Sequence, residues 1–242
     1  MLPHYSTRRF QRNGQRFYLA DGLEAPSVTS VLSATESEEN RARLRAWMDR
    51  TPDHENIRDS AARRGTRLHK RLEDHLLGKS QPSLLAGLLE PSADDLVHEQ
   101  LWAALQPFVE AIEEVALLEA PLWWRDDAQQ HHYAGAVDLV AKLKGEDGLI
   151  AIDLKTCTKP KRNRALWARA FIQLAAYRQA AEQVYEREGL LIDRAMVVSV
   201  DVQRFQLHPH VAAGEEFETF GEVWNDRLAI YYEQRALQAI AA

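Results

Sequence analysis

The chain is poor in cysteine and has no long apolar run, and both shortages narrow what it can be. One of its 242 residues is cysteine, Cys157. A single cysteine excludes a disulfide framework, a zinc site built on four cysteines and an iron–sulfur cluster held by cysteines. No apolar stretch approaches the ~20 residues of a membrane-spanning helix, and the arginine-rich segment Met1 to Arg16 leads into no signal-peptide core. We therefore expect a cytoplasmic protein without membrane contact.

Basic residues are outnumbered by acidic ones, 30 to 36, yet they are concentrated in two segments. Residues 155–181 contain seven basic residues and no acidic one, and residues 56–72 contain six against one aspartate. Arginine supplies 23 of the 30, and its planar guanidinium group suits phosphate better than lysine does. Each segment alone is consistent with a solvated helix face. Together they favour a groove for a polyanion, although the net charge of −6 argues against a nonspecific nucleic-acid coat.

Hydrophobic periodicity and turn residues predict one α/β domain over residues 1–242, with a mainly helical part, 1–112, before an αβ core, 113–242. A helix start is expected at 26–29, and the other predicted helices are 38–48, 57–77, 94–114 (with Pro107 kinking or dividing it), 165–188 and 215–240. The predicted strands are 16–20, 115–124, 133–143, 149–156 and 194–202, with 205–208 extending the last strand or pairing with it. This order predicts a mixed sheet flanked by helices, in which an antiparallel hairpin precedes a helical crossover.

Acidic side chains interrupt two of the predicted apolar strands. In the strand 149–156, the period of two places Asp153 and Lys155 on the same face. A turn centred between residues 145 and 147 brings Asp138 of the preceding strand opposite Asp153 or within a residue or two. Two carboxylates that close repel each other unless a cation lies between them, and oxygen ligands suit Mg²⁺ or Mn²⁺. An Asp-x-Lys tripeptide is also what an ordinary ion pair at a strand end looks like.

Two helices carry polar residues at spacings that place them on one face. Thr66, His69 and Glu73 share a face of the helix 57–77 beside its apolar seam, so His69 should be half-buried. Gln173 and Tyr177 are four residues apart on the helix 165–188 and interrupt its apolar stripe. A histidine hydrogen-bonded within the core and a surface hydrogen bond between Gln173 and Tyr177 would explain these positions without any ligand.

The four motifs together resemble those of the PD-(D/E)XK nuclease superfamily. In order they are G-T-x-x-H-x-x-x-E at 65–73, G-x-x-D at 135–138, D-x-K at 153–155 and Q-x-x-x-Y at 173–177. The similarity is closer to the RecB-like branch, which includes the mitochondrial genome maintenance exonuclease and its phage and bacterial relatives. Residues 26–32 also look like the opening of that exonuclease group. The resemblance spans residues 26–177 and implies a restriction-endonuclease-like core.

The resemblance implies a metal site at the two predicted strands. Asp138 and Asp153 match the metal-binding acids, and the backbone carbonyl of Leu154 would be a further ligand. His69 matches a histidine close to the metal or bound to it, and Glu119 is an auxiliary position. No proline precedes Asp138, although the G-x-x-D form is common in this branch, and the iron–sulfur cysteines of some members are missing.

The remaining motif residues imply catalytic and DNA-contacting roles. Lys155 matches the lysine that orients or activates the attacking water and steadies charge on the phosphate. Gln173 and Tyr177 match the motif that supports the site and meets the DNA strand. The residues expected at the DNA are Thr66, Arg67, Glu73, Lys159, Lys161, Arg162, Arg164 and Arg169.

The resemblance implies a DNA exonuclease that depends on Mg²⁺ or Mn²⁺ and lacks an iron–sulfur cluster. It would be a monomer that prefers single-stranded ends and acts in replication, repair or recombination. A structure-specific or restriction-type endonuclease is an alternative within the enzyme class, and a non-catalytic DNA-binding protein on a nuclease fold is another. A metal-dependent phosphatase would leave the basic segments unexplained. The presence of Asp138, Asp153, Lys155 and His69 favours an enzyme, since degraded members of the family usually lose the acids or the lysine.

Overall fold

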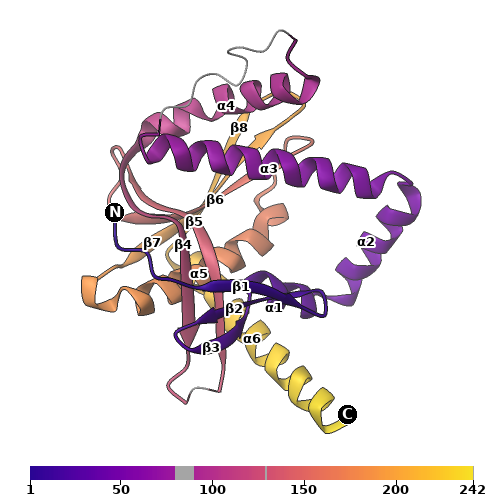
Figure 1. Ribbon diagram of the computed structural model, residues 1–242, viewed down its shortest axis with the longest axis vertical. Coiled ribbons are helices and arrows are strands. Elements are labelled where there is room, and N and C mark those ends of the chain that lie inside the picture. Colours follow the sequence, from indigo (N-terminus) through magenta and orange to yellow (C-terminus); the bar gives the residue numbers. More distant parts are fainter. Residues whose placement is uncertain (80–89, 129, 242) are drawn as a thin grey trace.

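The computed structural model describes residues 1–79, 90–128 and 130–241. Within these residues the centre is a five-stranded sheet, ordered β4–β5–β6–β7–β8 (Figure 1). β4, β5 and β6 are antiparallel, β7 is parallel to β6, and β8 returns antiparallel to β7. The strand bounds are β4 Ile112–Arg125, β5 His132–Leu143, β6 Leu149–Cys157, β7 Ile192–Asp201 and β8 Leu207–Ala213. The predicted mixed sheet, with its hairpin first and its helical crossover after it, is confirmed.

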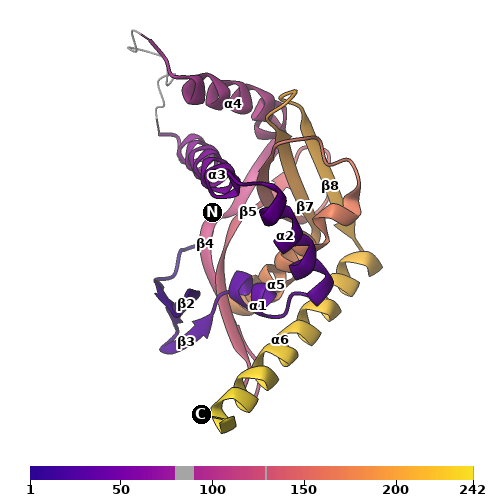
Figure 2. The same ribbon diagram turned by 90° about the vertical axis from the view of Figure 1, so that its right-hand side faces the viewer.

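Helices cover both faces of this sheet (Figure 2). α3 and α4 lie on one face, and α1, α5 and α6 lie on the other. The helix bounds are α1 Val28–Ala34, α2 Glu38–Arg50, α3 His54–Leu76, α4 Ala93–Ala111, α5 Ala168–Val184 and α6 Glu215–Ala241. Among the described residues, no helix is long and apolar enough to span a membrane.

Each face of the sheet has its own hydrophobic core. Ile152 of β6 packs with Leu68 of α3 and Leu105 of α4 in one core. Its neighbour Ala151 belongs to the other core, together with Phe171 of α5. Consecutive side chains of a strand point to opposite faces, so one short apolar strand supplies both cores. The α/β fold with helices on both faces follows from this double burial.

A small antiparallel sheet at the start of the chain was not predicted beyond its middle strand. It consists of β1 (Arg8–Arg12), β2 (Gln15–Ala20) and β3 (Leu23–Pro26). Only β2 corresponds to the predicted strand 16–20. The outer strands of this sheet, β1 and β3, carry few buried side chains. They therefore show little of the apolar alternation by which a strand is recognised in sequence.

Two predicted helices include residues that the structure places in another kind of element. The helix expected over 94–114 ends at Ala111 with Pro107 inside it, and β4 begins at Ile112. Glu113 and Glu114 favour a helix, but Ile112 pairs with β5, and this tertiary contact overrides their propensity. The helix expected over 165–188 is α5 with a short 3₁₀ helix at each end, Arg164–Trp167 and Glu186–Glu188.

Gly135 of β5 allows α5 to pack closely on the sheet. A Cβ atom at this position would lie 2.5 Å from Cε1 of Tyr177 and 3.0 Å from its Oη. No side chain larger than glycine fits against the ring in this arrangement. Gly135 and Asp138 lie three residues apart on β5. The strand that carries the acidic residue is therefore also the strand against which α5 packs.

Gly135→Ala should destabilise the fold by about 1–3 kcal/mol, because the added methyl group displaces the buried Tyr177 ring. Gly221→Ala is the matched control: it lies within α6, and its Cβ would meet only Nε2 of Gln179, at an ordinary 3.7 Å. There the change should stabilise by roughly 0.5–1 kcal/mol. Urea denaturation of both variants checks the pair, and equal free energies of unfolding would contradict the packing argument.

Candidate active site

The candidate site begins where β5 and β6 separate. The last pair at this end of their ladder is Leu139 with Ile152, so Asp138 and Asp153 occupy the next opposed position. There the backbone N–H of Leu154 donates a hydrogen bond of 3.0 Å to Oδ2 of Asp138. A carboxylate thus takes the place of a backbone partner, and the opening between the strands is lined by acidic groups.

Glu119 of β4 reaches the same opening through an unusual backbone conformation. Its φ is 45°, in the left-handed region, which costs a non-glycine residue roughly 1–2 kcal/mol. Leu118 packs in the core under α3 and α4, whereas Ala120 packs in the opposite core. Residues two apart on a regular strand share a face, so β4 turns over at Glu119. Strain of this kind concentrates at functional sites.

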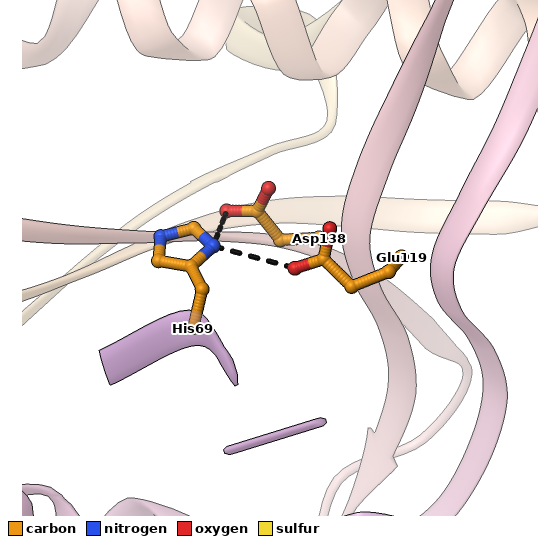
Figure 3. Close-up of side chains that lie close together, drawn as sticks. All are labelled: His69, Glu119 and Asp138. Atoms are coloured by element: carbon orange, nitrogen blue, oxygen red, sulfur yellow. Dashed lines mark hydrogen bonds and ion pairs between the residues drawn. The ribbon is translucent and has the colours of Figure 1, made fainter. Parts of the chain in front are cut away.

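His69 projects from α3 to join the two carboxylates (Figure 3). Its Nε2 lies 2.8 Å from the backbone oxygen of Leu154. Its Nδ1 lies 3.4 Å from Oε1 of Glu119 and 3.6 Å from Oδ2 of Asp138. The side chain is 26% exposed, which confirms the predicted half-burial. One ligand atom from each of His69, Glu119 and Asp138 lies within 4.8 Å of the others.

The surroundings of His69 keep its imidazole protonated at neutral pH. Burial lowers the pKa of His69, but the hydrogen bond to Glu119, the charge of Asp138 and the carbonyl of Leu154 raise it more, to about 9. The imidazolium therefore partly neutralises the carboxylates around it.

Asp153 is the most enclosed of the acids, with its side chain 2% exposed. Its Oδ1 accepts a hydrogen bond of 2.6 Å from Nζ of Lys155, while its Oδ2 is buried without a hydrogen-bond partner among the described residues. Burial raises the pKa of Asp153 to about 6; the charge of Asp138 adds to the rise and Lys155 opposes it. Burial also raises the pKa of Asp138, against the lowering effect of His69 and Lys155.

Lys155 is the second cation beside the acids, next to Asp153. Burial lowers the pKa of its ammonium, but Asp153 and Asp138 raise it more, so the net shift is upward. The predicted placement of Asp153 and Lys155 on one face of β6 agrees with their direct ion pair. Asp153 and Lys155 therefore form the ion pair that an Asp-x-Lys tripeptide allows, and this ion pair lies beside Asp138 at the candidate site.

Gln173 and Tyr177 lie beneath the acids on α5. Nε2 of Gln173 donates to Oη of Tyr177 at 3.3 Å. Burial raises the pKa of the Tyr177 phenol well above its usual value, and Tyr18, Asp138 and Asp153 raise it further. The phenol therefore stays neutral near two carboxylates. Tyr18 lies on β2 of the small N-terminal sheet, near Tyr177. The sequence did not predict this neighbour, because no motif connects β2 with α5.

The basic residues expected at the DNA fall into two groups. Arg67, Arg164 and Arg169 form ion pairs with Asp95, Glu216 and Glu36. Lys159, Lys161 and Arg162 are exposed and have no carboxylate within ion-pair distance in the described part of the chain. Thr66 is exposed on α3, and Glu73 accepts from Lys70 at 2.9 Å.

The donor atoms at the opening fit a divalent cation. The carboxylates of Glu119 and Asp138 meet the imidazole of His69 there, and the buried carboxylate of Asp153 and the Leu154 carbonyl lie on the adjoining strand β6. Hard oxygen donors suit Mg²⁺ and Mn²⁺. Asp153 offers an orphaned buried oxygen, which is costly to leave without a partner. A cation would also lower the pKa of Asp138 and Asp153, the two acids whose burial now raises it.

Comparison with known proteins adds a family to this geometry. The sequence model of the PD-(D/E)XK nuclease superfamily matches residues 39–241. No curated protein matches the chain. A crystal structure of a candidate exonuclease from Eubacterium rectale has 13% identity and a TM-score of 0.47, covering 72% of this chain and 68% of that one. A protein named SSO0001 has 14% identity and a TM-score of 0.33, covering 67% of this chain and 84% of that one. The family assignment depends on the sequence model.

Mn²⁺ should raise the melting temperature of the protein, and the rise should grow between pH 6 and pH 8. The raised pKa values mean that His69 stabilises the metal-free fold below about pH 6.5 and loses this effect as pH rises through 9, while Asp153 loses its effect as pH rises through 6. Bound metal must displace these protons, so its affinity increases as they leave. At a concentration about 100 times Kd, the gain is ~2.7 kcal/mol, roughly 5–10 °C for a chain of this length.

Asp138→Asn should abolish this Mn²⁺-dependent rise in scanning calorimetry. Glu113→Gln, an exposed acid of the same sheet that pairs with Lys142, should keep it. A rise that survives in Asp138→Asn, or one that shrinks as the pH increases, would contradict a metal site at this opening.

Proposed function

Because the chain belongs to the PD-(D/E)XK nuclease superfamily, we propose that it is a metal-dependent DNA exonuclease acting on single-stranded ends. The observation that carries the proposal is the convergence of His69, Glu119 and Asp138. Leu154 holds two of them in place, with its carbonyl on His69 and its N–H on Asp138. Asp153 and Lys155 lie on the adjoining strand. Carboxylates that can hold a metal ion, with a lysine beside them, can supply the activated water and the charge stabilisation that phosphodiester hydrolysis requires.

The proposed metal ligands are the side chains of Asp138, Asp153, His69 and Glu119 and the backbone carbonyl of Leu154. The ion would be Mg²⁺ or Mn²⁺. When bound, such an ion lowers the pKa of water and stabilises negative charge on a phosphate. The chain contributes rigidity, because the Leu154 amide fixes Asp138 and the carbonyl of the same residue fixes His69.

Lys155 is the proposed catalytic cation. Its hydrogen bond to Asp153 sets the direction of the ammonium group, and the two neighbouring acids keep it protonated. In that state it can orient a water molecule and donate to a phosphate oxygen as negative charge develops. Gln173 and Tyr177 would support the acids from α5, since the neutral phenol lies within electrostatic reach of Asp138 and Asp153.

The proposed substrate contacts lie in the basic segments on both sides of the site. Lys159, Lys161 and Arg162 are the strongest candidates because they lack carboxylate partners among the described residues. We also propose contacts to the DNA strand from the other predicted residues, which are Thr66, Arg67, Glu73, Arg164 and Arg169. We further propose that the protein works in the cytoplasm as a monomer, in replication, repair or recombination.

Lys155→Ala should reduce cleavage by at least about 100-fold, since it removes a charged donor directed at the reacting phosphate. The assay uses single- and double-stranded DNA labelled separately at the 5′ and 3′ ends, with Mg²⁺, Mn²⁺ or EDTA. Lys144→Ala, an exposed lysine of the β5–β6 turn, is the control and should retain activity. The label pattern separates exonuclease from endonuclease action and gives the polarity.

Wild-type protein that binds DNA but cleaves none of these substrates with either metal would refute the catalytic proposal. That result would favour a DNA-binding role for the same fold. Cleavage that persists in EDTA would refute the metal dependence.

A further inference from the structure

α2 has an unusual position in the fold, because all thirteen of its residues are exposed. A helix of this length has little stability of its own in water and normally buries one face. α2 instead joins α1 to α3 at a distance from the sheet (Figure 1). It nevertheless carries Leu44, Trp47 and Met48, which are among the exposed large apolar side chains of the chain. These side chains are available to a ligand.

A hollow of about 500 Å³ lies between the end of α2, the start of α3 and the segment that follows β6. Trp47 of α2 and Ile57 of α3 line one side of it. Thr156, the residue after Lys155, lines the other side. The hollow therefore continues directly from the strand that carries the proposed catalytic lysine.

The charged side chains that line this hollow are all cations. Arg64, Lys159 and Lys161 contribute to its walls, and no acidic residue does so among the described residues. Nε of Arg64 is buried without a hydrogen-bond partner in the same part of the chain. A desolvated guanidinium N–H without an acceptor is costly, and a phosphate oxygen would satisfy it. Lys161 also lies 4.8 Å over the ring of Trp167, which holds its ammonium near the hollow.

The hollow combines an exposed aromatic ring with cations that pair with no carboxylate in the described part of the chain. This combination binds unpaired nucleotides. Every base has a face that stacks on an aromatic side chain, whereas the bases of a duplex are already stacked on each other. The cations track the backbone while the ring holds a base. Trp47, at 39% exposure, is the one residue of α2 that lines this hollow.

We propose that Trp47 is a stacking platform for an unpaired base of the nucleic-acid strand, with Arg64, Lys159 and Lys161 holding the adjoining phosphates. This inference rests on the proposed function and extends it, because it gives the exposed helix a role. It makes a preference for single strands a property of α2 rather than of the metal site. The strand would lie between α2 and the end of β6 and lead to Lys155.

The experiment compares the binding of two fluorescent strands in EDTA by fluorescence anisotropy. One is a 12-nucleotide deoxythymidine strand, and the other is an abasic strand with the same number of phosphates. Wild-type protein should bind the first strand roughly 5- to 100-fold more tightly, the range expected for one stacked base. Trp47→Ala should lose most of this ratio, and Trp47→Phe should keep much of it. Arg64→Gln should weaken the binding of both strands by a similar factor.

Met48→Ala is the matched control, since Met48 neighbours Trp47 on α2 with 37% exposure and does not line the hollow. It should leave the ratio unchanged. A Trp47→Ala protein that keeps the full wild-type ratio overturns the inference, whether or not it cleaves DNA. If that variant keeps the ratio while wild type cleaves with Mg²⁺, the proposed function stands and only the stacking platform falls. If wild type neither binds nor cleaves DNA, both fall.

Discussion

The burial of several carboxylates at one opening is the constraint on which the rest of this structure depends. Asp138 and Asp153 are opposed where β5 and β6 separate, and Glu119 enters the same opening from β4. Burial raises the pKa of both aspartates. The fold retains these acids at a cost in stability, and it places His69 and Lys155 on either side of them as partial compensation. A site that is costly without a cation is well suited to bind one.

The surrounding elements are arranged to hold this group of charges in place. α3 supplies His69, which is fixed by the Leu154 carbonyl at 2.8 Å. α5 approaches closely enough to place Tyr177 beneath the acids only because Gly135 has no side chain in the way. The left-handed backbone at Glu119 turns β4 over and brings its carboxylate to the opening. Packing, backbone strain and ionisation are therefore connected at one point of the sheet.

Sequence patterns predicted the parts of this arrangement that repeat with the geometry of a strand or a helix. The period of two placed Asp153 beside Lys155, and the turn position brought Asp138 opposite Asp153. Helical spacing predicted the half-buried His69. No sequence pattern predicted the turn of β4 at Glu119, because a positive φ at a glutamate depends on tertiary contacts. The exposed position of Trp47 was equally hidden, since an apolar residue in a helix usually indicates a buried face.

A crystal of the protein soaked in Mn²⁺ would show directly whether the acids at this opening bind a metal ion. Anomalous scattering identifies Mn²⁺ without reference to any assumed ligand. A strong peak is expected between the carboxylates of Asp138 and Asp153, next to the Leu154 carbonyl and within reach of His69. A Mn²⁺ peak elsewhere in the molecule, with this opening free of it, would contradict the claim that these acids are held together for a cation.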